Sequence, residues 1–472
     1  MSPFVPVEVV RAELGPALGD GVLVTDPDVL DAHSRDQALW CPADGAVALV
    51  RARSVADVQE TMRFATRHHV PVVPQGTRTG LSGGANAVPG CILLNLERMT
   101  RVLGIDTAER TVTVEPGIIN QDLKDALAPH GLSYPPDPGS VAISSIGGNV
   151  ATNAGGLCCV KYGVTRDYVR QLRVVLADGT LTTIGTTTTK GVAGLDLRGL
   201  FVGSEGTLGV VVEVTLRLVP ALPEPLTAVA TFADVRHAAA TVADLMASGA
   251  QPSLLESMDG TTLRMINAYR DVGLDADAGA MLLMQSDGSG SAATARAEVE
   301  AFAGFAEGHE AIDVVFSEDP TDSAALVAAR RMAQPAYEHH AQSHGGGQLL
   351  DDVCLPRHRL PEFYDRLDEI SAETGLTVAV VAHAGDGNTH PSIFFDTSDP
   401  DEVARADEAF DRIMQVGLEL GGTITGEHGV GHLKRRWLAR ELDEGNRAVH
   451  RAVKAALDPL GILNPGKMFA DL

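Results

Sequence analysis

Apolar positions near the start of the chain alternate in blocks that predict a strand, a helix and a second strand. A short apolar run at 46–50 predicts the first strand. Ser54 supplies an N-cap, and a helix is expected after it because apolar residues recur on one face, at Val55, Val58, Met62 and Ala65. A second strand is expected at 70–73. The pattern predicts a β-α-β unit ending in a glycine-rich turn, preceded by a helical lead-in at 1–40.

Shorter strands dominate the next stretch of the chain. Apolar alternation at 92–114, 169–183 and 210–219 predicts strands separated by brief helices. Residues 42–219 are therefore expected to form an α+β domain with several buried strands. A cluster of prolines then interrupts the pattern, at Pro220, Pro223 and Pro225. We expect a domain boundary there.

Strands and helices alternate after this boundary. Strands are expected at 227–232, 280–285, 311–317, 376–385 and 392–395. Helices are expected at 235–247, 292–305, 360–372 and 402–420. This alternation favours an antiparallel sheet with helices packed on one face. The tail, ALDPLGILNPGKMF, is turn-rich.

Composition narrows the class of protein. A chain of 472 residues is too long for one ordinary core, so two or more domains are expected. The 62 acidic residues outnumber the 37 Lys and Arg residues and give a net charge of −25. Such a surface repels phosphate backbones and anionic membranes, which argues against nucleic-acid binding. Acidity also aids solubility, and an anionic substrate would need a local cationic site.

Cysteine usage and the N-terminus favour a cytoplasmic protein. Five scattered cysteines do not form a disulfide framework, and Cys158 and Cys159 lack the spacing of a metal or redox motif. The N-terminus lacks the basic start and apolar core of a signal peptide. No window approaches the ~20 apolar residues of a transmembrane helix. Peripheral membrane attachment through a partner stays open.

The first candidate binding motif is PQGTRTGLSGGA, at 74–85. Glycine and hydroxyl residues after a strand allow backbone N–H groups to wrap a pyrophosphate. The segment fits neither G-x-G-x-x-G nor G-x-x-x-x-G-K-[ST], so it is not a Rossmann or Walker fingerprint. A plain glycine-rich surface turn is the alternative.

Two further segments are rich in glycine. PPDPGSVAISSIGGNVATNAGGLCCVKYG, at 135–163, has few large side chains and suits a flat ligand lying on backbone, although a tightly packed loop would also fit. LFVGSEGTLGVVVEVTLRL, at 200–218, is slightly better explained as an ordinary junction between a loop and a strand.

The strongest chemical signal is HAGDGNTH, at 383–390, together with GEHGVGH, at 426–432. Two histidines flank a sharp GDGN turn that can bring both imidazoles to one side. Two histidines and a carboxylate suit Zn²⁺ or Mn²⁺ and leave coordination positions open. The histidine beside the glutamate is suited to act as a general base. His432, His339 and His340 lack such support and are interpreted as surface or packing residues.

Taken together, these motifs resemble the FAD-linked oxidoreductases of the vanillyl-alcohol-oxidase, or PCMH-type, superfamily. The branch they resemble includes D-lactate dehydrogenase, D-2-hydroxyglutarate dehydrogenase and the D-type subunit of glycolate oxidase. The resemblance extends from about residue 47 to 469 and includes DLRGLFVGSEGTLGVV and DPLGILNPGK. It implies an α+β fold with a PCMH-type FAD-binding domain of two α/β subdomains, at 1–221. A ferredoxin-like substrate (cap) domain with an antiparallel sheet would follow at 222–425, and 426–472 would return to the FAD domain.

The resemblance also implies roles for individual residues. The FAD pyrophosphate would contact Pro74, Gly76, Thr77, Thr79, Gly80, Leu81, Ser82, Gly83 and Gly84. The flavin and its ribityl chain would lie along Pro136, Gly147, Gly148, Asn153, Gly155 and Gly156. The adenine half would lie beside Glu205 and Gly206, and the tail would return through Asn464 and Lys467. The metal ligands would be His383, His390 and Glu427, with His428 as base, Asn388 at the substrate, and Arg330 or Arg331 on its carboxylate.

The implied reaction is metal-assisted oxidation of a small D-2-hydroxy acid by hydride transfer to flavin N5. No His or Cys lies within 74–84, so non-covalent FAD is expected, although Cys158 and Cys159 leave this open. The segment GGGQLLDD lacks the lysine typical of the hydroxyglutarate branch, which favours D-lactate or glycolate. Alternatives are D-2-hydroxyglutarate oxidation, an oxidase of the superfamily, or a non-catalytic flavoprotein subunit of an electron-transfer complex. A metallohydrolase would leave the FAD loops unexplained.

The expected partners follow from this reaction. No cysteine cluster suits an iron–sulfur centre, so electrons must pass to an external acceptor. A quinone, a cytochrome, an electron-transfer flavoprotein or an iron–sulfur subunit would serve. A homodimer is possible.

Overall fold

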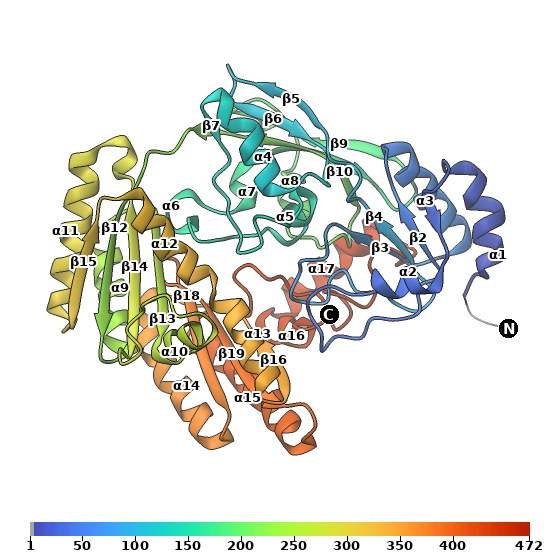
Figure 1. Ribbon diagram of the computed structural model, residues 1–472. Coiled ribbons are helices and arrows are strands. Elements are labelled where there is room, and N and C mark those ends of the chain that lie inside the picture. Colours follow the sequence, from blue (N-terminus) through green and yellow to red (C-terminus); the bar gives the residue numbers. More distant parts are fainter. Residues whose placement is uncertain (1–3) are drawn as a thin grey trace. The chain divides into compact units, whose positions relative to one another are not determined.

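The computed structural model describes residues 4–472, which form two compact units (Figure 1). Unit 1 contains the chain up to Gly155, Val164–Ala221 and Glu427–Leu472. Unit 2 contains Gly156–Gly163 and Leu222–Gly426. The mixed α+β class expected from the sequence is confirmed, with an antiparallel sheet in unit 2.

Unit 1 is built on two main sheets. The first has the order β1-β2-β4-β3, from Leu23–Val24, Ala48–Arg51, Ile92–Asn95 and Val72–Gln75. The second has the order β5-β6-β10-β8-β9, from Val102–Asp106, Thr111–Val114, Val210–Arg217, Val169–Val175 and Leu181–Gly185. A two-stranded sheet joins β7 (Leu132–Ser133) to β11 (Val219–Pro220).

The predicted β-α-β unit is present in the first sheet. Strands β2 and β3 both pair in parallel with β4, and helix α3 (Val55–His68) connects them. The Ser54 hydroxyl accepts a hydrogen bond from the N–H of Asp57 and caps α3. The remaining helices of the unit are α1 (Val7–Val9), α2 (Pro27–Ala32), α4 (Asn120–Leu127), α5 (Ile146–Thr152), α7 (Thr165–Tyr168), α8 (Arg198–Phe201), α16 (Arg435–Glu441) and α17 (Glu444–Leu457).

The expected helical lead-in is only partly right. A short π-helix at Val10–Leu14 and helix α2 are present, but β1 lies between them and pairs antiparallel with β2. The paired segment, Leu23–Val24, is only two residues long, too short for a period-two pattern to distinguish it from a turn.

Unit 2 is one antiparallel sheet with helices on both faces. Its strands run β15-β12-β14-β13-β18-β19-β16, from Asp313–Ser317, Leu226–Phe232, Ala280–Ser286, Leu254–Asp259, Thr377–His383, Asn388–Asp396 and Gly346–Leu350, with β17 (Val353–Cys354) on β19. The helices are α6 (Cys159–Tyr162), α9 (Val235–Ala247), α10 (Gly260–Tyr269), α11 (Ala292–Gly308), α12 (Pro320–Arg331), α13 (Ala333–Ser343), α14 (Leu360–Thr374) and α15 (Pro400–Glu419).

The expectation that helices cover one face of this sheet is wrong. On β18, Ala379 and Val381 pack in a core cluster with α10 and α13, whereas Val378 and Val380 lie beside α14 on the other face. Because both faces are covered, nearly every residue of the central strands β13, β14 and β19 is buried. Among the strands of this sheet, β14 (AMLLMQS) and β18 (TVAVVAH) have the nearly continuous apolar sequence that is typical of strands buried on both faces.

One short segment leaves unit 1 for unit 2. Residues Gly156–Gly163 follow the glycine-rich stretch of unit 1, yet Leu157 packs with Leu254 and Leu283 in unit 2. Asp287 binds both Lys161 and Tyr162. The domain expected at 1–221 includes this segment, so the sequence pattern does not reveal the excursion.

Candidate active site

The glycine-rich turn of unit 1 follows β3 directly. A Cβ atom at Gly76 would overlap the Ser145 hydroxyl, so glycine allows this backbone to approach the start of α5. A Cβ at Gly84 would lie 3.4 Å from the Glu205 carboxylate. The first residue of the turn, Gly76, therefore lies against the start of α5, and its last residue, Gly84, lies near Glu205. Such a half-buried backbone, with glycine at several positions, fits a pyrophosphate.

The GSEG turn joins the same assembly. The N–H groups of Gly203 and Glu205 donate to the carbonyls of Val150 and Ala151 in α5. Glu205 adopts the left-handed region, with φ of 51°, and Asn153 ends α5 in the same region. The sequence slightly favours an ordinary loop here. Hydrogen bonding to α5 instead makes this turn part of the arrangement that the resemblance assigns to FAD.

The C-terminal segment returns to these loops within unit 1. The Asn464 side-chain amide donates to the carbonyls of Gly84 and Glu205, each at 2.8 Å. Lys467 donates to the carbonyl of Asn86 at 2.9 Å. The backbone N–H of His432 donates to the Ser82 carbonyl at 2.8 Å. The C-terminal segment therefore holds the end of the glycine-rich turn, near residues 82–86, in position.

The Glu205 carboxylate holds part of the GEHGVGH loop. It accepts hydrogen bonds from the N–H groups of Val430 and Gly431, both at 2.7 Å. Full burial raises the pKa of Glu205 to about 7, although these two N–H donors act to lower it. The side chain thus stabilises the loop that follows the predicted metal ligand and base. A direct contact with adenine, implied by the resemblance, stays a prediction.

The Glu205 pKa gives a pH-dependent stability. Because the folded-state pKa of about 7 lies above the ordinary 4.5, ionisation between these values favours the unfolded chain. The penalty is absent below pH 4.5 and complete above pH 7. We expect the free energy of unfolding of the wild type, relative to Glu205→Gln, to fall by about 1 kcal/mol per pH unit in that interval. Denaturant unfolding of both flavin-loaded proteins at pH 5, 6 and 7 measures this difference. Parallel pH profiles would contradict it.

The two histidines of HAGDGNTH lie on a hairpin of unit 2. His383 ends β18 opposite Asn388, while His390 on β19 lies opposite Val381. Side chains two apart on a strand share a face, so this register places both imidazoles on one side of the sheet. Their ring centroids are 5.0 Å apart and the rings are nearly perpendicular.

Glu427 completes a possible metal-binding group. It is bonded to Gly426, the last residue of unit 2, and offers a carboxylate oxygen to the two imidazoles. The three ligand atoms lie within 4.8 Å of one another, with His383 and His390 buried and Glu427 half-buried. The donor set fits a divalent transition metal with open positions. His428, the predicted base, is half-buried next to Glu427.

A buried glutamate behind His383 was missed by the sequence analysis. Both carboxylate oxygens of Glu256, on β13, lie 2.8–2.9 Å from Nδ1 of His383. An ionised carboxylate there keeps the proton on Nδ1, so Nε2 is the nitrogen able to bind a metal. Glu256 also pairs with Arg330 at 2.9 Å. A glutamate in the apolar run LLESM was the one available signal, because an isolated charge in a buried strand requires a partner.

Arg330 and Asn388 each retain a buried polar atom without a protein partner among residues 4–472. These atoms are Nε of Arg330 and Oδ1 of Asn388, and the residues are 7% and 5% exposed. A buried polar group of this kind normally finds a ligand, water or protein partner. A Cβ atom at Gly426 would overlap the Asn388 amide, so glycine there allows the close approach of this loop. Asp352 accepts hydrogen bonds from Thr425 and the Gly426 N–H and holds the loop.

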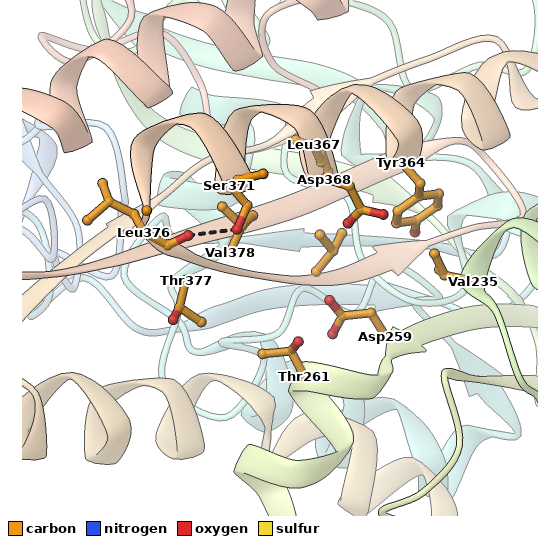
Figure 2. A pocket seen from close by; sticks show the side chains of 13 residues that line it. Val235, Asp259, Thr261, Tyr364, Leu367, Asp368, Ser371, Leu376, Thr377 and Val378 are labelled. Carbon is orange, nitrogen blue, oxygen red and sulfur yellow. Dashed lines mark hydrogen bonds between the residues drawn. The ribbon is translucent and has the colours of Figure 1, made fainter.

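A cavity of about 420 Å³ in unit 2 lies between α14 and the sheet (Figure 2). None of the predicted site residues lines it. Its polar groups are used in local structure. Asp259 caps α10 through the Thr262 N–H, and the Ser371 hydroxyl donates to the Leu376 carbonyl. Tyr364 lies 3.3 Å from the Ser257 hydroxyl. We therefore assign this cavity a packing role.

Comparison with known proteins identifies the family. Residues 224–468 match the C-terminal domain of FAD linked oxidases, and residues 46–185 match the FAD binding domain. The chain belongs to the FAD-linked oxidase family. Similar relatives of this FAD-linked oxidase include glycolate oxidase subunit GlcD of Bacillus subtilis, 40% identical over 90% of this chain and 89% of the relative. GlcD of Escherichia coli is 38% identical over 92% and 87%. D-lactate dehydrogenase of Anaerostipes hadrus is 34% identical over 95% and 94%.

The fold of this FAD-linked oxidase is also found in solved structures. p-Cresol methylhydroxylase has a TM-score of 0.81, with 18% identity over 98% of this chain and 97% of that chain. 4-Ethylphenol oxidase from Gulosibacter chungangensis has a TM-score of 0.78, with 20% identity over 99% and 98%. The recognised superfamily, the FAD-binding domain and the FAD-dependent oxidoreductase class are confirmed. Within residues 4–472, no helix combines the length and apolarity needed to cross a bilayer.

Glu256 yields a prediction for this FAD-linked oxidase. Changing it to Gln removes the charge that holds the Nδ1 proton of His383, and metal affinity is expected to fall roughly 10- to 100-fold. Isothermal titration of the flavin-loaded protein with Zn²⁺ or Mn²⁺ measures this. Glu373→Gln, which alters an exposed pair with Arg412, is the matched control. Unchanged metal affinity in the Glu256 variant would contradict the positioning role.

Proposed function

We propose that this member of the FAD-linked oxidase family is an FAD-dependent dehydrogenase that oxidises a small D-2-hydroxy acid, with D-lactate or glycolate favoured, to the 2-oxo acid. The observation that supports this most is the donor group of His383, His390 and Glu427. A 2-hydroxy acid presents a hydroxyl and a carboxylate on adjacent carbons, and these two oxygens suit the open positions of such a centre. The names of the relatives, glycolate oxidase subunit and D-lactate dehydrogenase, support the same substrate class.

Each proposed residue has a defined task. Arg330 binds the substrate carboxylate with donors that its pair with Glu256 does not use, and Asn388 orients the substrate through its amide. His428 accepts the proton of the C2 hydroxyl at a ring nitrogen. Zn²⁺ or Mn²⁺ at the cluster would lower the pKa of that hydroxyl, and FAD would accept the hydride. The proposal requires Glu427 and His428 to face the flavin ring.

The protein would hold FAD without a covalent bond and would pass electrons to an external acceptor. A quinone, a cytochrome, an electron-transfer flavoprotein or an iron–sulfur subunit are the proposed classes. One relative is named as a subunit of glycolate oxidase, and this name supports the proposal that the present protein also acts together with a partner subunit. We propose a cytoplasmic location, with membrane contact only through such a partner, and a homodimer as one assembly.

Steady-state assays with an artificial dye acceptor test the substrate class. We expect turnover with D-lactate or glycolate and little with L-lactate or D-2-hydroxyglutarate. The smaller acids are favoured because GGGQLLDD lacks the lysine of the hydroxyglutarate branch. Preference for D-2-hydroxyglutarate would contradict the proposed small substrate and would favour a D-2-hydroxyglutarate dehydrogenase. Stoichiometric hydrogen peroxide under air would indicate an oxidase.

A further inference from the structure

Four arginines from three segments of unit 1 meet in one pocket. Arg166 lies on α7, Arg170 on β8, Arg198 on α8 and Arg217 at the end of β10. The pocket has a volume of about 460 Å³, a size typical of small-molecule sites. Its acidic lining residues are Asp167 and Asp196, so four positive charges face two negative charges and leave a net charge of +2. This local charge is opposite to the −25 of the whole chain.

Local structure holds two of the four guanidinium groups, those of Arg198 and Arg217, in position. Arg198 donates to the Val169 carbonyl at 2.8 Å, and Arg217 donates to the Asp167 carbonyl at 2.7 Å. Arg217 also lies over the Tyr168 ring, 4.4 Å from its centroid. These contacts orient the arginines but neutralise none of their charge. An arginine carries five N–H donors, so several donors per residue remain for a ligand.

The two carboxylates balance this charge only in part. Asp196 pairs with Arg198 at 3.3 Å and is 64% exposed, so solvent screens the pair. The Asp167 carboxylate accepts the N–H of Val164. Burial lowers the pKa of Arg170, and repulsion by the charges of Arg217 and Arg198 lowers it further. A bound anion would relieve this repulsion.

We propose that this arginine pocket binds the phosphate group of a small phosphorylated molecule. Planar guanidinium groups pair bidentately with phosphate, and a dianion matches the net charge of the pocket. The pocket is distinct from the predicted pyrophosphate turn, because no residue of 74–84 lines it. One edge of the pocket, at Val202 and Arg166, adjoins Gly203 and Asn153, which belong to the segments that the resemblance assigns to FAD. The proposal is independent of the D-2-hydroxy acid reaction.

Binding of inorganic phosphate and of glycerol phosphate to the flavin-loaded protein tests the proposal. Equilibrium dialysis at constant, low ionic strength should find one site per chain. The double variant Arg166→Gln/Arg170→Gln should weaken binding by at least about tenfold, since two charge-assisted contacts are lost. The matched control Arg63→Gln/Arg412→Gln also removes two charges, but from exposed pairs elsewhere. It should bind as the wild type does.

A second variant tests phosphate binding even if the double variant does not fold. Asp196→Asn removes an exposed competing carboxylate and should tighten phosphate binding several-fold. Tighter binding of glycerol phosphate than of inorganic phosphate would indicate an ester ligand, and the reverse order a free phosphate. Equal binding by wild type, double variant and control would overturn the proposal. Loss of FAD from the double variant would also overturn it, because the pocket would then belong to the flavin site.

Discussion

Replacing His428 with alanine is expected to lower kcat by about two to four orders of magnitude while FAD stays bound. The reason is that the substrate hydroxyl would lose the group that removes its proton, whereas the flavin segments would keep their contacts. The loop itself is held by Glu205 through Val430 and Gly431, and the His428 side chain takes no part in those bonds. Turnover and the flavin content of the purified variant measure the two effects separately.

His358→Ala is the matched control, because His358 is an exposed histidine of unit 2. It should keep wild-type turnover. Near-normal turnover in the His428 variant would remove this residue from the base role. Loss of FAD together with turnover would instead assign it a structural role.

Replacing His390 with alanine is expected to abolish stoichiometric metal binding and to lower kcat/KM by at least about 100-fold. His390 supplies one of the three ligand atoms grouped within 4.8 Å, and the remaining His383 and Glu427 leave too few donors for a stable site. Metal content per chain, measured by mass spectrometry, gives the first effect directly. The wild type treated with a chelator should show the same loss and should recover when Zn²⁺ or Mn²⁺ is restored.

His340→Ala provides the control for His390. His340 lies on α13 and packs against Phe394, a residue of the same strand as His390. Its removal should leave metal content unchanged. Full activity in a metal-free His390 variant would contradict metal assistance. Hydride transfer to the flavin would then not require a metal.

The sequence predicted the elements whose signal is local. Helix α9 occupies 235–247 as expected, because Asp234 caps it and one face is apolar. The grouping of the proposed metal ligands was predictable because two of them flank one tight turn and the third lies in a second glycine-rich loop. The class of donor atoms is fixed by residue type, so no knowledge of strand order was needed to propose it.

Features that depend on strand order were not predictable. Glu256 lies 127 positions before His383 and meets it because β13 pairs with β18, a neighbour relation that no local pattern encodes. The covering of both sheet faces had a signal in the nearly continuous apolar runs of β14 and β18, which the expectation of a one-sided sheet overlooks. The arginine pocket had no local signal, because Arg166 and Arg170 are neighbours in the sequence but only the fold brings Arg198 and Arg217 to them.

The most direct test of the proposed substrate class is anaerobic titration of the purified protein, followed by its visible flavin spectrum. The four acids to add in turn are D-lactate, L-lactate, glycolate and D-2-hydroxyglutarate. We expect D-lactate or glycolate to bleach the flavin band and L-lactate to leave it intact. A flavin band that none of these acids bleaches would contradict the proposed substrate class while leaving the membership of the FAD-linked oxidase family intact.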